Sequence, residues 1–403
     1  MNNFYFYLYI FLWVIYGLQG SLYAHGNYIS VGALALVMVM SLYYFVYAII
    51  HYKLPKPLKI LSLLIAIWTI YGLEPILFGT GQTAFFIQPF SYLKNIYMSL
   101  LPIFVFYVFS MKGFITEDRL RWLLVLFLII AIFNFYDYQA SALTSFEGER
   151  KEVTNNAGYV VVSLLPLLPV FWRRPIFQYI LLGVCLLFAL MGMKRGAIVS
   201  GFLCSIWMIL VSFRQDKYER SGKRGGHNFI RLLATIAIVG AVVYVVQYLL
   251  STSDYFSQRV SSTIEGDYSG RESIYGTYFT WFINQTDVIR LLFGNGADAT
   301  LRYFTNYAHN DWLEILIDNG VIVALVYGAY WISMIVMLLK GKRGSTTMLM
   351  FGCFVIIYLL KTFFSMSYNS VTVYAACAIG YAFANFQSRR SNVKSEITTS
   401  THN

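Results

Sequence analysis

Charged residues are scarce in this sequence. Asp, Glu, Lys and Arg together make up 12% of the 403 residues, whereas 58% are hydrophobic and the mean hydropathy is +0.60. An average soluble domain is about 25% charged, so a water-soluble enzyme is excluded. The 18% aromatic content excludes disorder, and the continuous apolar runs exclude a bacterial-type barrel, whose strands alternate polar and apolar residues. We expect an all-α, polytopic integral membrane protein.

Cysteines and known catalytic motifs are also scarce. The cysteines lie inside apolar runs without a CxxC spacing, which predicts neither a disulfide framework nor a zinc site. They are Cys185, Cys204, Cys353 and Cys377, and we expect them to pack or to face lipid. No Walker loop and no HExxH is present, which argues against ATP-driven transport and zinc proteolysis. We expect no metal and no cofactor.

Apolar runs make up most of the sequence. Many of them are long enough to cross a membrane, which takes roughly 20 residues. About twelve are expected, near 4–20, 29–50, 57–77, 88–110, 120–137, 157–172, 175–192, 196–213, 229–250, 320–340, 346–364 and 369–388. The first run lacks a basic flank and a small-residue cleavage site, so it is interpreted as a span and not as a removable signal. The expected parts are spans one to nine (1–250), a helical periplasmic connection (251–318), spans ten to twelve (319–388) and a disordered cytoplasmic tail (389–403).

Basic residues predict the orientation. If the N-terminus is cytoplasmic, 20 of the 30 Lys and Arg residues fall in the inner connections and eight in the outer ones. Cytoplasmic connections of membrane proteins carry such an excess, so both termini are predicted to be cytoplasmic in a multi-pass protein of a bacterial inner membrane. The same bias explains the net charge of +11 without a nucleic-acid partner, and it leaves membrane lipids as the expected contact of the basic surface.

The outer connection, residues 251–318, is much longer than an ordinary loop and too aromatic to be disordered. Three features follow one another in it: Gly270-Arg271-Glu272, then Phe293-Gly294-Asn295-Gly296, then a segment that runs from Ala308 through His309 to Glu314. Leu313, Leu316 and Gly320 follow His309 at helical spacing. His309 is therefore predicted to begin an amphipathic helix at the membrane surface.

His309 has two interpretations. Histidine titrates closest to neutral pH, which suits a base that removes a proton from a hydroxyl nucleophile. The alternative is an interfacial histidine that is hydrogen-bonded to a neighbouring tyrosine or carbonyl. The residue alone does not decide between the two.

Cations on the outer side also have two interpretations. Lys194 and Arg195 stand at the outer end of span eight, where the charge bias disfavours them. They are either an interfacial, snorkelling pair or an anion site, to which Arg271 could add a second guanidinium fork. Glu74 and Lys361 lie within spans, where isolated charges usually face a cavity or a partner.

Taken together, these residues resemble the O-antigen ligase and O-antigen polymerase superfamily. The resemblance is carried by four elements in this order: Lys194-Arg195-Gly196, the Gly-Arg at 270–271, the Phe-Gly-x-Gly at 293–296, and His309-Asn310 with Leu313, Leu316 and Gly320 after it. It covers about residues 190–340, and the first five spans resemble the family only in hydropathy. One departure is Val323, where a second glycine is often found.

The resemblance implies a metal-independent, inverting glycosyltransferase that acts on the periplasmic face. Its donor would be a glycan on undecaprenyl diphosphate, and its acceptor either the lipid A core or a lipid-linked repeat unit. By this resemblance Arg195 and Arg271 hold the diphosphate, and His309 activates or positions the acceptor hydroxyl. The residues expected to contribute to substrate binding are Lys194, Asn310, Glu314 and Lys361.

The alternative function is a polysaccharide flippase or a secondary transporter. Transporters often have two similar halves, with charges and broken helices near the midplane of the membrane. Here only the second half contains the long outer connection, and the informative cations lie at its outer side. A continuous midplane cavity would favour the transporter, and a lateral groove beside Arg195 would favour the transferase.

Overall fold

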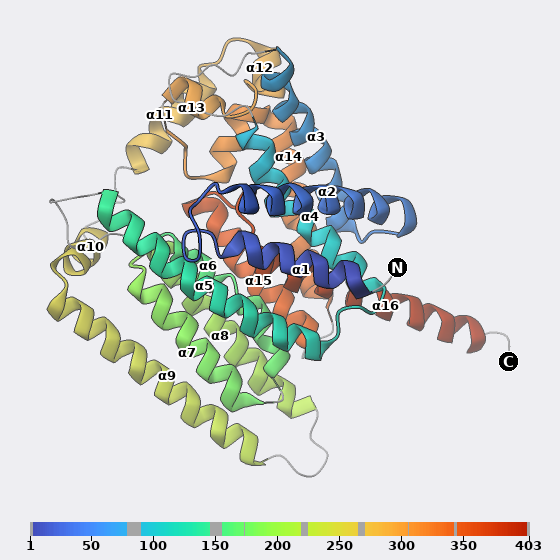
Figure 1. Cartoon of the computed structure of the whole chain (residues 1–403), viewed down its shortest axis with the longest axis vertical. Coiled ribbons are helices and arrows are strands. Elements are labelled where there is room, and N and C mark those ends of the chain that lie inside the picture. The colour runs from blue at the N-terminus through green and yellow to red at the C-terminus, as the bar shows by residue number, and fades with distance from the viewer. Residues whose placement is uncertain are drawn as a thin grey trace.

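The protein is an all-α membrane protein in the computed structural model, which describes residues 3–78, 90–145, 155–172, 174–218, 225–264, 271–304, 306–341 and 345–400. Within these ranges the chain forms helices and no β-strand (Figure 1). The first group of helices is α1 (Asn3–Gly17), α2 (Tyr28–His51), α3 (Lys56–Phe78), α4 (Ser91–Met111), α5 (Glu117–Ser145), α6 (Ala157–Val162), the 3-10 helix η1 (Leu165–Phe171), α7 (Pro175–Met191), α8 (Arg195–Tyr218) and α9 (Gly225–Thr252). The second is α10 (Asp254–Ile264), α11 (Arg271–Ile283), α12 (Val288–Phe293), α13 (Ala299–Phe304), α14 (Asp311–Lys340), α15 (Thr346–Phe364) and α16 (Val373–Ser400).

Seven of the described helices are long and apolar enough to cross a membrane. They are α2, α3, α4, α5, α9, α14 and α15. Four further expected spans correspond to shorter apolar helices, and the last lies in α16. The multi-pass architecture is therefore shown, whereas the number of twelve spans stays a prediction. The expectation of a disordered tail is wrong as far as Ser400, because α16 continues to that residue.

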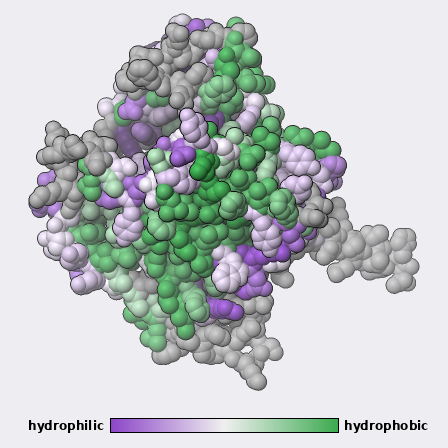
Figure 2. Space-filling view, viewed as in Figure 1, coloured by the Kyte–Doolittle hydropathy of each residue, from purple (hydrophilic) through white to green (hydrophobic). Residues whose placement is uncertain are grey.

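The outer connection forms helices, as expected from its aromatic content. Four short helices, α10 to α13, precede α14. In Figure 1, α11, α12 and α13 lie together at the top, beside the ends of α3 and α14. Figure 2 shows apolar residues over much of the visible face of the helical body below them. Large exposed side chains such as Leu325, Ile332 and Leu339 on α14 are suited to lipid contact.

The centre of the bundle is built on α4 and α16. Fourteen of the 21 residues of α4 are buried. The first half of α16 is rich in small residues, and a Cβ atom added to Gly380 would lie 2.7 Å from the carbonyl oxygen of Ile103. Small residues allow membrane helices to approach this closely. The four cysteines pack in the interior and are all free.

Basic connections and both chain ends meet at one end of the bundle. Arg119 donates from Nη1 to the side chain of Asn3 at 3.2 Å, and Gln387 donates to the carbonyl of Lys53. Figure 1 shows both ends of the chain on the right, away from α10 and α11 on the left. Arg119 and Lys53, both expected in inner connections, therefore lie on the same side as the helices at the two ends of the chain.

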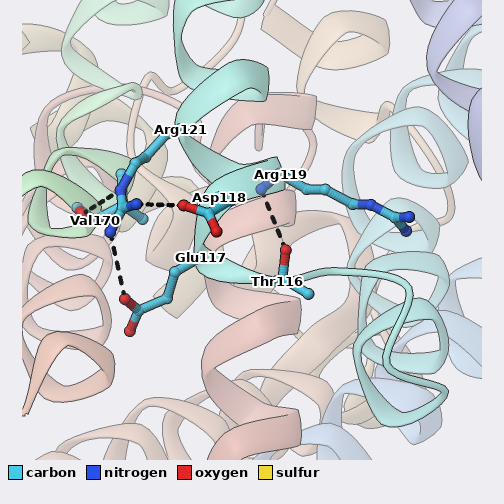
Figure 3. Close-up of polar contacts among 6 residues, drawn as sticks. All are labelled: Thr116, Glu117, Asp118, Arg119, Arg121 and Val170. Carbon is cyan, nitrogen blue, oxygen red and sulfur yellow. Dashed lines mark hydrogen bonds and ion pairs between the residues drawn. The ribbon is translucent and has the colours of Figure 1, made fainter.

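The first turn of α5 illustrates how this end is held together (Figure 3). Thr116 accepts the backbone N–H of Arg119, as a helix N-cap does. Arg121 contacts Asp118 and, at 3.7 Å, Glu117, and its Nε donates to the carbonyl of Val170 at 3.1 Å. One guanidinium thereby joins the start of α5 to the end of η1.

Helix α14 is broken at Gly320, whose φ of 78° and ψ of 178° are not helical. A break leaves carbonyls of the preceding turn without helical partners. Here the N–H of Asn295 donates to the carbonyl of Ile317 at 3.0 Å, and the N–H of Gly296 donates to that of Asp318 at 2.9 Å. The Phe293–Gly296 segment therefore seals the break from outside.

The close contact between the Phe293–Gly296 segment and the break in α14 requires a glycine in each of them. A Cβ atom on Gly294 would lie 2.3 Å from the carbonyl oxygen of Asp318, and one on Gly320 would lie 2.4 Å from that of Leu292. Both glycines also have positive φ, which side chains disfavour. Residues 321–340 beyond the break would span about 30 Å as a helix, enough to cross a bilayer alone. A membrane span can therefore be formed by the part of α14 that follows the break, without including it.

Candidate active site

The spacing predicted that His309 begins a helix, but the helix begins two residues later, at Asp311, and His309 lies just before its N-cap. Its φ is +53°, and the helix begins at Asp311 after Asn310, whose side-chain oxygen accepts the N–H groups of Trp312 at 2.9 Å and Leu313 at 3.3 Å. Asn310, expected to bind substrate, is therefore the N-cap that fixes the start of α14. The helix start consequently fixes the backbone that carries the imidazole.

One side of α11 holds the His309 loop. Arg271, Tyr275 and Tyr278 are spaced four and three residues apart, so they share a helix face. Tyr278 donates to the carbonyl of Asn306 at 2.8 Å and stacks on Phe304 with ring centroids 4.0 Å apart. Tyr275 reaches the carbonyl of His309 at 3.4 Å. This face thus supports the loop at both ends.

The same face of α11 reaches the end of α15. Arg271 donates from Nη1 to the carbonyl of Phe364 at 2.8 Å, and the hydroxyl of Tyr275 donates to that of Phe363 at 3.1 Å. These carbonyls belong to the last turn of α15, where helical partners are missing. Arg271 keeps further N–H donors for a ligand, because a guanidinium carries five.

Two cations act on the His309 imidazole. Its pKa is lowered by burial first, and then by the positive charges of Arg271 and Lys194. A lowered pKa means that the ring is neutral at neutral pH and can accept a proton. Lys194 comes from the residue before α8 and Arg271 from the start of α11, so the fold brings together positions 77 residues apart in the chain.

Lys361 extends this group from α15. Its ammonium donates to the hydroxyl of Ser370 at 2.7 Å and lies 5.2 Å from the ring centre of Tyr159. The side chain is buried, and the charges of Asp311 and Lys194 both act on it. We refer to Lys194, Arg271, His309 and Lys361 as the cation site. Lys361 faces inward there and orders the segment that follows α15.

The glycine of the Lys-Arg-Gly element has a structural reason. A Cβ atom at Gly196 would lie 1.8 Å from the hydroxyl of Tyr159, so glycine leaves room for the tyrosine ring. Arg195 begins α8 and is half-buried beside Lys194. The charge of Arg271 also acts on Tyr159, which places this ring among the cations.

Glu314 lies on the other side of the loop, away from solvent. It is fully buried, and its carboxylate accepts the hydroxyl of Thr300 and, at 2.7 Å, the N–H of Ala308. Asp318 accepts the N–H of the same threonine at 3.1 Å. Asp298 lies close enough to interact electrostatically with both, and burial raises its pKa to about 6 although Arg302 opposes the shift. We refer to Asp298, Glu314 and Asp318 as the acid cluster.

Several residues of the site were not found from the sequence. Asp311 is fully buried, and its carboxylate accepts the N–H groups of Ser367 at 2.8 Å and Tyr368 at 3.2 Å. It thereby shapes the segment that Lys361 contacts. The spacing of Tyr275 from Arg271 could have indicated a shared helix face, whereas nothing in the sequence links Tyr159 or Asp311 to the cations.

Apolar residues of α8 and α15 form a groove of about 330 Å³. Its lining is Leu203, Ile206, Trp207, Leu210, Val355, Ile356, Leu359 and Leu360. It ends on α15 next to Lys361 and begins on α8 two turns below Arg195. A lateral groove therefore runs along α8 and α15, the two helices that carry Arg195 and Lys361.

The part of the chain that the structure describes contains no group of three His, Cys, Asp or Glu side chains arranged to hold a metal ion. Comparison with models of known protein families gave no match, and a search of curated proteins found no relative. The functional argument therefore depends on the geometry of the site.

Proposed function

We propose that this protein transfers a glycan from undecaprenyl diphosphate to an acceptor hydroxyl on the periplasmic face of a bacterial inner membrane. The observation that carries the proposal is the position of His309, whose loop is held by α11 through Tyr275 and whose imidazole lies within the electrostatic reach of Arg271 at the start of α11 and Lys194 just before α8. One group can accept a proton while the others stabilise an anion. Hydroxyl activation and departure of a diphosphate need these two functions side by side.

In the proposed reaction, the acceptor oxygen forms a bond to the anomeric carbon of the donor sugar as the bond from that carbon to the diphosphate oxygen breaks. The hydroxyl proton passes to His309. The negative charge that develops on the leaving diphosphate is stabilised by Arg271 and Lys194, with Arg195 next to them in the chain. The groove between α8 and α15 suits the isoprenoid chain, since it is apolar and lies below the same cations. The acceptor is the lipid A core or a lipid-linked repeat unit.

A secondary transporter or flippase is the second candidate, and one observation favours it. Helix α14 is broken and carries buried acids, and broken helices often form transport sites. The position of the break argues against this function, because residues 321–340 are long enough to cross the membrane without it. The backbone of Phe293–Gly296 also occupies the gap.

Reconstitution distinguishes the two functions. Purified protein in liposomes receives an undecaprenyl-diphosphate glycan and acceptor, with and without a chelator, and both transfer and movement of the glycan across the bilayer are measured. We expect chelator-resistant transfer on one side only. Movement of the glycan without transfer would replace this proposal by the transporter.

Orientation is tested in cells by single cysteines. Thr277→Cys on α11 and Lys56→Cys at the start of α3 are both exposed, whereas the native cysteines are buried. An impermeant thiol reagent should label only the variant at position 277. The reverse pattern would put the cation site on the cytoplasmic side and contradict a periplasmic reaction.

A further inference from the structure

A second cavity lies next to Lys361 of the cation site. It measures about 260 Å³ and is enclosed by α1, α4, α5, α6 and the segment between α15 and α16. Ser370 lines it and also accepts Lys361 at 2.7 Å. Val160, another lining residue, follows the Tyr159 that Lys361 covers. The cavity therefore adjoins Lys361, which also stands next to the groove residue Leu360 in the chain.

The lining is uncharged, and its amide groups are set in a mostly apolar surface. Amides come from Asn95, Asn134 and Asn369, while Trp13 and Tyr374 contribute aromatic surface. All three amides are half-buried. Since no charged side chain lines the cavity, it offers nothing to balance a diphosphate. A ligand here must be neutral.

Two of these amides point to a hydroxyl-rich ligand. In the described part of the chain, the side chains of Asn95 and Asn369 have no protein hydrogen-bond partner, although each amide offers two donors and one acceptor. A lipid chain would leave these groups unsatisfied, which costs about 1–3 kcal/mol for each. A sugar ring supplies hydroxyls to the amides and an apolar face to the aromatic rings.

The size of the cavity limits how much sugar enters. Pockets for drug-sized ligands measure roughly 300–1,000 Å³, so a volume of about 260 Å³ suits one ring and not an extended chain. The partly exposed lining residues, Tyr16 and Met98 among them, show that the cavity opens at the protein surface. The remainder of a longer acceptor would stay outside.

We propose that this cavity binds the acceptor, by one uncharged sugar ring held on Asn95 and Asn369. The inference rests on the proposed transferase function, because it assigns the second substrate of that reaction. It separates the two substrates by charge: the anionic donor lies with the cations, and the neutral acceptor ring lies in the amide-lined cavity.

The first test measures kinetics of the full-length protein with saturating donor and varied acceptor. The variant Asn95→Leu/Asn369→Leu should raise the KM for acceptor by roughly 25- to 100-fold, at about 5- to 10-fold for each lost hydrogen bond, and leave the KM for donor unchanged. Asn385→Leu is the matched control, a half-buried asparagine of α16 at the opposite end of the bundle. Asn95→Gln, which keeps the amide, should recover at least half of the affinity lost in Asn95→Leu.

The second test does not require transfer. Binding of a delipidated single repeat unit, prepared from the surface glycan of the cell that makes the protein, is followed by saturation-transfer NMR. We expect binding to the native protein and to Arg271→Ala, and loss of binding in the double variant. Equal binding by the double variant, or no binding to the native protein, would overturn the inference and leave a cavity filled by water or lipid.

The two tests separate this inference from the proposed function. If the native protein binds the sugar through these amides but transfers nothing, the cavity stands and the transferase is wrong. If transfer occurs and the double variant matches Asn385→Leu, the transferase stands and this cavity is not the acceptor site.

Discussion

The cation site and the acid cluster lie on opposite sides of the loop that carries His309, yet their surroundings differ. The acids at Glu314 and Asp318 are almost completely buried and accept hydrogen bonds from Thr300 and Ala308 within the protein. His309 and Arg271 are only partly buried, and their charges or protons remain available at a surface. The comparison shows that the acids of this region hold the loop from within the protein, while His309 and Arg271 stay partly exposed, as the proposed function requires.

The electrostatic cost of bringing like charges together also differs between the cation site and the acid cluster. Bringing Lys194, Arg271 and Lys361 together costs repulsion between like charges, which an anionic ligand would remove. The negative charge of the acid cluster is compensated within the protein, by the positive charge of Arg302 and by hydrogen bonds such as that from Thr300 to Asp318. A cluster of positive charges that is partly exposed at Lys194 and Arg271 is suited to bind an anion there.

The largest expected effect is that of His309→Ala, which tests whether the cation site is catalytic. Transfer should fall at least about 100-fold, the usual minimum for a general base, while protein level and thermal midpoint stay near native. His25→Ala is the control, an exposed histidine that pairs with Asp137 at 2.9 Å. More than half of native activity in His309→Ala would make this histidine structural, like the acids behind it.

The second effect concerns Arg271 and separates charge from geometry. Lysine keeps the charge but loses the planar fork, so Arg271→Lys should impair transfer and Arg271→Ala should impair it further, by about 10- to 150-fold for a lost charge-assisted contact of roughly 1.5–3 kcal/mol. Arg290→Ala, whose native partner is Asp287 at 3.5 Å, serves as the control. Full activity of Arg271→Ala would remove the donor from the cation site.

Glu314→Ala tests the other side of the comparison. Loss of the carboxylate leaves the N–H of Ala308 and the hydroxyl of Thr300 without their acceptor, at a cost of about 1–3 kcal/mol in the free energy of unfolding. The thermal midpoint and kcat should both fall, while the KM for donor changes little. The exposed Glu272→Ala should change neither. A native midpoint with a raised KM would instead make Glu314 a substrate ligand, as the sequence suggested.

The smallest effect is a displacement of the pH profile. A base must be neutral to accept a proton, so activity is lost as pH falls through the pKa of His309, which lies below its ordinary value. Lys194→Gln removes one of the positive charges that lower this pKa, and the acid limb of kcat/KM should move to higher pH. Lys94→Gln on α4 is the control. An acid limb that stays in place would show that Lys194 does not act on the base.

Much of the fold follows from the sequence because hydropathy is a property of each segment by itself. The expected spans all fall on helices, and the aromatic outer connection is helical. The break at Gly320 could not be predicted, since it depends on a segment 25 residues earlier that supplies two N–H groups. Gly294 and Gly320 were visible as glycines, but their contact was not.

The candidate site, like the fold, could be predicted from the sequence only in part. The cations and His309 stood out because charges are rare in an apolar chain. Glu314 and Asn310 were assigned to substrate from their position beside His309, but side chains on neighbouring helical positions point in different directions. Glu314 faces the interior and Asn310 caps the helix. The amides of the second cavity come from three distant segments and carry no charge, so nothing in the sequence marked them.

The packing of α16 against α4 has a consequence for biogenesis. The helix that covers the Ile103 region of α4 begins at Val373, so it leaves the ribosome long after α4 does. Between these events, the face of α4 that α16 will cover must be shielded by lipid or by the insertion machinery. Helix α4 therefore stays partly uncovered until α16 has been synthesised. A chain that stops before residue 373 would reach the membrane with an incomplete core that quality-control proteases can attack.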